Sequence, residues 1–207
     1  MTESAADAAW LRRRWVRRFP SLGPVGDGLV SRYGAASRIY HDVRHLRHVL
    51  ETLDLLAGEC DDLDAVELAG WFHDAVYDVR RGDNEEASAA LAEVVLGPRL
   101  DSAVLAEVVR LVLLTRDHAV PDGDRNGAVL CDADLVVLAG ETQEYDAYAQ
   151  RVRAEYADVS DEDFRAGRSA VLRGLLDLPS LFSTRLGRDE WEKPARANLA
   201  RELASLV

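Results

Sequence analysis

The spacing of apolar residues is the feature of this sequence that most constrains its fold. Along almost the whole chain these residues recur every three or four positions, as on one face of a helix, and the alternation typical of strands is scarce. The stretch from 42 to 58 is an example, with an apolar stripe made of Val43, Leu46, Val49, Leu50, Leu53 and Leu56. The sequence therefore predicts an all-α protein.

Glycine, proline and clusters of small polar residues divide this pattern into separate helices. The predicted helices cover residues 3–19, 27–34, 42–58, 64–77, 84–96, 102–115, 129–139, 141–157, 160–177 and 188–206. Residues 117–127 are rich in Asp, Gly and Pro and are predicted to form a surface loop. No linker or internal repeat is visible, so we expect one helical domain over residues 1–207, with helix 3–19 as a candidate for a peripheral element.

Charge and cysteine content limit the partners and the compartment that we expect. The 25 basic and 37 acidic side chains give a net charge of −12, which repels a nucleic-acid backbone, so no nucleic-acid polymer is expected as a partner. The first residues lack a signal-peptide pattern, and no apolar run is long enough to span a bilayer. The two cysteines, Cys60 and Cys131, form no CxxC motif. We expect a cytoplasmic protein outside the membrane, with assembly into a homo-oligomer left open.

The residues that could carry chemistry are histidines and aspartates within apolar stretches. All five histidines lie between positions 41 and 118, and three of them share one helix face: His41, His45 and His48. His73 and Asp74 end a strongly apolar run, and Asp132 and Asp134 interrupt another. Burying an unpaired carboxylate costs several kcal/mol or more, so these aspartates need a cation, hydrogen bonds or a wet cavity.

A divalent metal would satisfy these side chains. Imidazole and carboxylate together suit Mn, Fe, Co, Ni or Zn, and Mg less well because it prefers oxygen ligands. The candidate ligands lie on three predicted helices, and facing helices of a bundle commonly build such sites. An open coordination position on the metal would activate water against a phosphoryl group.

The order His45, His73-Asp74, Asp134 resembles the H…HD…D signature of HD-domain phosphohydrolases. A wider similarity links the chain to a bacterial subgroup described as predicted metal-dependent HD-superfamily phosphohydrolases. The matching stretches are 37–45 (SRIYHDVRH), 71–78 (WFHDAVYD), 83–88 (DNEEAS), 115–118 (TRDH), 132–135 (DADL), 164–168 (FRAGR) and 195–199 (ARANL). The resemblance implies an HD-like helical bundle that hydrolyses a phosphate ester of a nucleotide or other small metabolite.

The resemblance also implies a ligand set, in which one position has two candidates. His45, His73 and Asp74 would bind the metal, and Asp74 would thereby belong to the catalytic set. Asp134 is preferred to Asp132 as the last ligand, because HD proteins commonly place it in an Ala-Asp-x-Leu-like context. Here Leu135 comes one position early, which keeps Asp132 as the alternative.

Other polar residues near these stretches are candidates for catalysis or substrate binding. Glu85 or Glu86 could act as general base or support the ligands from outside. Arginine forks grip phosphate with two donors, and imidazoles near the site can contact substrate, which gives these candidates: Arg38, Arg44, Arg80, His41 and His118. One metal is expected, with His118 as the candidate for an additional ligand.

Three rival interpretations remain at this stage. The same fold could be a metal- or nucleotide-binding module for sensing or assembly, with little turnover. An HD relative with two irons could activate oxygen, and a structural helical protein would need no site. Metal analysis and a panel of phosphoesters would separate these rivals.

Overall fold

The computed structural model describes residues 3–206, and within this range the chain is helical and has no strand. The longer helices are α1 (Glu3–Arg18), α2 (Pro24–Tyr33), α3 (Val43–Leu56), α4 (Leu63–Phe72), α5 (Asn84–Leu96), α6 (Ser102–Leu114), α7 (Arg125–Leu135), α8 (Thr142–Glu155), α9 (Asp161–Asp177) and α10 (Glu192–Leu206). Short elements are η1 (Pro20–Leu22), η2 (Val136–Ala139) and η3 (Gly187–Trp191). The prediction of an all-α bundle is confirmed, and none of the described helices is both long and apolar enough to cross a bilayer.

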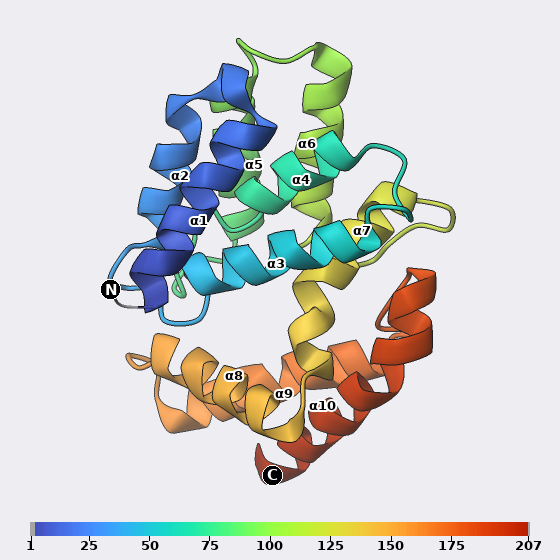
Figure 1. The fold of residues 1–207 in the computed structure, drawn as a ribbon. Helices are drawn as coiled ribbons and strands as arrows, with labels where there is room; N and C mark the ends of the chain where they lie inside the picture. The colour runs from blue at the N-terminus through green and yellow to red at the C-terminus, as the bar shows by residue number, and fades with distance from the viewer. Residues whose placement is uncertain (1–2, 207) are drawn as a thin grey trace.

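The helices form two layers, which are joined by the α7–η2 segment and by contacts of α8 with residues 39–42 just before α3. Helices α1 to α7 lie on one side and α8 to α10 on the other, and the α7–η2 segment runs from the first layer into the second (Figure 1). Each layer has its own buried apolar cluster, and Trp191 packs against both. The junction between the two layers is therefore the place where side chains from distant parts of the sequence meet.

Helix α1 is packed into the first layer. Leu11 and Trp15 are buried in its apolar cluster, and the Trp15 indole meets Trp71 edge to face with ring centroids 5.0 Å apart. Arg14 of the same helix is buried, and its Nε donates to the fully buried Glu67 at 2.8 Å. These contacts join the first helix to α4, which carries part of the candidate site.

Helix α4 ends earlier than the sequence pattern predicts, at Phe72 and not near Tyr77. Beyond it, the backbone polar groups bind tertiary partners in place of a continuing helix. The Asp74 N–H donates to the Tyr33 hydroxyl, and the Arg38 guanidinium donates to the carbonyl oxygens of Asp74 and Ala75. Since these partners are remote in sequence, local periodicity could not reveal the end of the helix.

Helices α7 and α2 also begin at other positions than predicted. Helix α7 begins at Arg125 and not at 129, because the Asp124 side chain accepts from the Gly127 N–H and caps the first turn. Helix α2 begins at Pro24, since proline at the first helical position has no N–H that needs a partner. The predicted loop thus becomes shorter, and it contains His118 with a positive φ of 54°.

Candidate metal centre

His45 is held in the first turn of α3 by a side-chain cap. The Asp42 carboxylate accepts from the N–H of Arg44 at 2.9 Å and of His45 at 3.4 Å. This cap satisfies N–H groups that have no partner within the helix, and so defines where α3 starts. His45 consequently sits on the buried side of α3, at the junction of the two layers. The aspartate before an amphipathic run is a signal from which this cap could have been read in the sequence.

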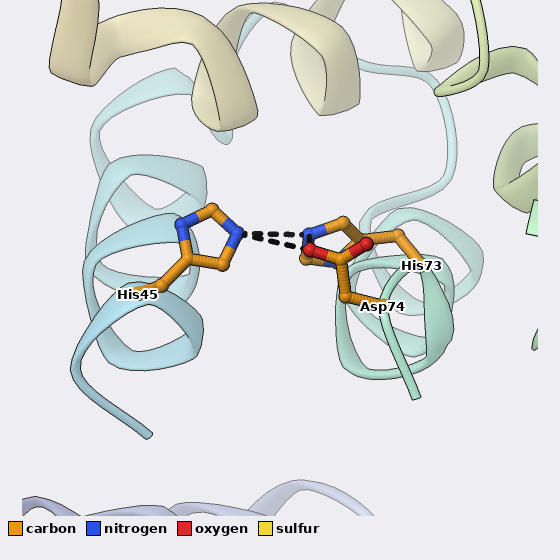
Figure 2. A group of neighbouring side chains, drawn as sticks. All are labelled: His45, His73 and Asp74. Carbon is orange, nitrogen blue, oxygen red and sulfur yellow. Dashed lines mark hydrogen bonds and ion pairs between the residues drawn. The ribbon is translucent and has the colours of Figure 1, made fainter. Parts of the chain in front are cut away.

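His73 and Asp74 reach the site from the end of α4. The His73 backbone is still helical and its N–H donates to the Ala69 carbonyl oxygen, and from this last turn the side chains of His73 and Asp74 both turn toward His45 (Figure 2). Nδ1 of His73 lies 2.8 Å from the Gly70 carbonyl oxygen, which can only accept a hydrogen bond. The proton therefore occupies Nδ1, and the Nε2 lone pair of neutral His73 is left for a cation.

The fourth side chain comes from α7. Oδ1 of Asp134 lies 3.3 Å from Nε2 of His45 and 3.6 Å from Nε2 of His73. Asp132 does not reach this group, although it was the alternative ligand. Positions two apart on a helix project about 200° apart, so these two aspartates face opposite sides of α7. The Asp132 carboxylate accepts from the backbone N–H groups of Ser183 and Thr184, both at 2.8 Å.

The spacing of His45, His73 and Asp74 fits a single cation. Nε2 of His45 lies 3.0 Å from Nε2 of His73, and Oδ2 of Asp74 lies 3.5 Å and 3.3 Å from these two nitrogens (Figure 2). Two ligands about 2.1 Å from one cation are about 3.0 Å apart at a right angle and about 3.4 Å apart at the tetrahedral angle. The buried group of His45, His73 and Asp74 could therefore hold a metal ion.

The charges of the cluster favour a positive species at its centre. Burial lowers the pKa of His45, but hydrogen bonds to Asp134 and Asp74 outweigh burial and raise this pKa to about 9. The pKa of His73 is also raised, because the attraction of the Asp74 carboxylate, which raises this pKa, is larger than the effect of burial, which lowers it. Burial acts to raise the pKa of Asp74 and of Asp134, yet the neighbouring histidines hold both well below their usual range. A divalent cation would supply this positive charge in place of protons.

Two further histidines lie beside the cluster. Nε2 of His118 is 2.9 Å from Oδ2 of Asp134, the oxygen that does not face His45. Nδ1 of His41 is 2.5 Å from Oε2 of the buried Glu155. The His41 ring also stacks on the Tyr77 ring, with the two ring centroids 3.9 Å apart. Glu155 was not found by sequence reasoning, since its role depends on α8 meeting the segment before α3. His48, by contrast, is exposed on α3.

A cleft of about 960 Å³ opens onto the cluster. His73, Asp74 and Asp134 line it, together with His41 and His118. The cleft is many times larger than a water molecule, so it can admit a small organic molecule next to the metal position.

The two candidate glutamates differ in their surroundings. Glu85 lines the cleft, and within residues 3–206 its carboxylate has no hydrogen-bond partner. Glu86 is not among the lining residues, and it instead pairs with Arg116. The geometry therefore favours Glu85 over Glu86 for a role in the cleft.

The three arginines predicted to grip phosphate do not line the cleft. Arg38 is occupied by backbone carbonyl groups, including that of His41 at 3.1 Å. Arg44 pairs with the cap residue Asp42, and Arg80 is an exposed residue paired with its neighbour Asp78. The guanidinium groups that line the cleft belong to other positions, namely Arg81, Arg116 and Arg168.

Comparisons of the chain with protein-family models, with curated proteins and with solved structures found no match. The resemblance to HD-domain phosphohydrolases therefore stays a hypothesis, and the geometry of the cluster and its cleft is the structural evidence on function.

Proposed function

We propose that this protein is a metal-dependent phosphohydrolase of the HD type, acting on a phosphate ester of a nucleotide or other small metabolite. One observation carries the proposal: the Nε2 atoms of His45 and His73 lie 3.0 Å apart, and each lies 3.3–3.6 Å from a carboxylate oxygen of Asp74 and of Asp134, beside an open cleft. Buried polar groups this close need a shared counter-charge, and the cleft gives a ligand access to it.

Each side chain of the cluster has a role that follows from its contacts. His45, His73, Asp74 and Asp134 would hold the metal, and His118 would keep the Asp134 carboxylate in place. A divalent metal bound here lowers the pKa of water and withdraws charge from a phosphoryl oxygen. His73 needs no change of tautomer to bind it, because the Gly70 carbonyl already keeps the proton on Nδ1.

The cleft supplies groups for proton transfer and for binding phosphate oxygens. Glu85 lines the cleft, has no hydrogen-bond partner among the described residues 3–206, and would accept a proton from the attacking water. Arg81 and Arg116 also line the cleft and would donate to phosphoryl oxygens. Both arginines also pair with carboxylates, Arg81 with Asp83 and Arg116 with Glu86, which keep the guanidinium groups in position.

The test combines metal analysis with phosphate release. Protein purified without chelator is expected to hold about one metal ion per chain, and with Mn²⁺ or Ni²⁺ to release phosphate from members of a phosphoester panel. His73→Ala should lose both properties. His48→Ala is the matched control, since this exposed histidine of α3 lies outside the cluster.

Two results would contradict the proposal. Metal content that is the same in His73→Ala as in the unaltered chain would show that the cluster is not the metal site. Bound metal without phosphate release from any ester would instead identify a metal- or nucleotide-binding module with little turnover.

A further inference from the structure

The cleft extends beyond the cluster along one face of α9. The residues of this helix that line the cleft lie on one face of the helix: Asp163, Phe164, Gly167, Arg168, Val171, Gly174 and Leu175. Val171 is 54% exposed. A Cβ atom added at Gly167 or Gly174 would meet nothing within 4 Å. This part of the cleft, which we call the α9 arm, therefore has open space in front of walls that are apolar apart from Asp163 and Arg168.

Two tyrosine rings connect the metal cluster to the α9 arm. The Tyr40 ring lies 5.1 Å from the His45 ring and 4.8 Å from the Tyr148 ring, measured between centroids. The guanidinium carbon of Arg168 in turn lies 5.3 Å from the Tyr148 ring centroid. A molecule with its phosphate at the cluster could thus extend past these rings to Arg168.

Arg168 is a buried cation with one donor group left over. Its side chain is 9% exposed, and Nε and Nη2 donate to the two carboxylate oxygens of Glu202 at 2.8 Å and 2.9 Å. Nη2 also lies 3.2 Å from the Tyr148 hydroxyl. Within residues 3–206, no acceptor is found for Nη1. Nη1 is not among the fully buried atoms that lack a partner, so it is accessible at the cleft, where a ligand oxygen could accept its hydrogen bond.

The net charge of the Arg168–Glu202 pair indicates which kind of ligand oxygen would accept a hydrogen bond from Nη1. Arg168 and Glu202 together are neutral, and the bidentate geometry keeps them paired. A neutral hydroxyl or carbonyl oxygen therefore fits Nη1 better than a second phosphate group would.

We propose that the substrate is a phosphoester of an amphipathic small molecule, an inference that rests on the proposed function. Its apolar part packs against the α9 arm, and a neutral oxygen at its far end accepts a hydrogen bond from Nη1 of Arg168. The phosphate end lies at the metal cluster. The α9 arm and Arg168 thereby determine specificity for the organic part of the substrate.

Calorimetric binding of non-hydrolysable phosphonates to the Mn²⁺-loaded chain tests this inference without requiring turnover. Hexylphosphonate should bind about tenfold more tightly than methylphosphonate, since apolar contacts discriminate at this level. 6-Hydroxyhexylphosphonate should bind more tightly still. Gly174→Leu, which fills the arm, should remove the effect of chain length, and Gly28→Leu is the control on an exposed helical glycine of α2.

The effect of the hydroxyl group tests Arg168 separately. The double variant Arg168→Leu/Glu202→Leu leaves no buried carboxylate unpaired, and it should bind hexylphosphonate and the hydroxylated compound equally. Gly174→Leu keeps the inference testable if the double variant fails to fold.

Equal affinity of the unaltered chain for methyl- and hexylphosphonate would overturn the inference, and so would a lack of hexylphosphonate binding. A change of self-association in Gly174→Leu, seen by sedimentation with phosphonate affinity unchanged, would assign the α9 face to a second copy of the chain and would also overturn it. If chain length matters but no ester is hydrolysed, the proposed function fails while the ligand class stands.

Discussion

Replacing Asp134 or Asp132 of α7 by asparagine, one at a time, should affect two different properties. Asp134→Asn should weaken metal binding, and Asp132→Asn should lower the stability of the fold. Asp134 faces the imidazoles of the cluster, whereas the fully buried Asp132 accepts hydrogen bonds from the segment before α10. The two residues are separated by a single position in the sequence, and both substitutions remove one negative charge without changing side-chain size. Each variant is therefore the control for the other.

The structure indicates how large the two effects should be. Loss of a ligating carboxylate in Asp134→Asn should weaken metal affinity by about 100-fold or more, which is about 2.7 kcal/mol. In Asp132→Asn, the amide nitrogen faces donors of Ser183 or Thr184 and leaves one of them unsatisfied. The expected cost is about 2 kcal/mol of unfolding free energy, or roughly 4 to 8 °C in Tm for a chain of this length.

Thermal unfolding with EDTA and with excess Mn²⁺ measures both effects at once. Metal at about 100 times its Kd should stabilise the unaltered chain by about 2.7 kcal/mol, which is roughly 5 to 11 °C. Asp132→Asn should lower Tm in EDTA and keep this metal-dependent increase. Asp134→Asn should reduce the increase to about 0.4 kcal/mol at the same metal concentration.

The opposite pattern would refute the assignment. If Asp132→Asn abolished the metal-dependent increase in Tm and Asp134→Asn retained it, the metal would bind on the other side of α7. The cluster of His45, His73, Asp74 and Asp134 would then not be the metal site.

Three further predictions concern stability. Gly26→Ala should destabilise the fold by about 1–3 kcal/mol, measured by urea denaturation, because the added Cβ would collide with the Trp15 indole; an unchanged midpoint would contradict this contact. Arg14→Met should lower the free energy of unfolding by about 3–5 kcal/mol in the same assay, since it removes a partner of the buried Glu67. A decrease below about 1 kcal/mol would contradict this, because it would mean that the other ion pair of Glu67 is enough to stabilise the buried carboxylate. Burial raises the pKa of Glu202, but its buried guanidinium partner outweighs this and holds the pKa below the usual 4.5. The resulting stability is present above pH 4.5 and lost as pH falls through the lower folded-state pKa, so Glu202→Gln should show a smaller loss of Tm between pH 5 and pH 3.

Helical periodicity was sufficient for the fold class and for the elements that carry the cluster. The apolar stripe of residues 42–58 corresponds to α3, and the apolar run before His73 corresponds to α4. Side-chain chemistry also indicated the kind of site, because histidines and aspartates inside apolar runs need partners when they are buried. These conclusions depend on interactions within a few residues of each other, which is the range over which sequence patterns carry information.

The arginines that line the cleft could not be predicted from sequence patterns. Arg38, Arg44 and Arg80 are close in sequence to the ligand segments, yet they bind backbone or neighbouring carboxylates outside the cleft. Arg116 and Arg168 line the cleft because the loop before α7 and helix α9 pack around it. Proximity along the chain is a poor guide here, since a cleft between two layers takes its walls from many segments.

By itself, the sequence determined that the chain is helical, which helices carry imidazole and carboxylate groups, and that buried carboxylates among them need a cation, hydrogen bonds or a wet cavity. Only the tertiary structure decided that α4 ends before Asp74, that α7 turns Asp134 and not Asp132 toward His45, and that α9 borders the cleft. The reason is physical. Local periodicity follows from backbone hydrogen bonds within a helix, whereas the end and the rotation of a helix depend on partners more than ten positions away, such as Tyr33 for α4 and Thr184 for α7.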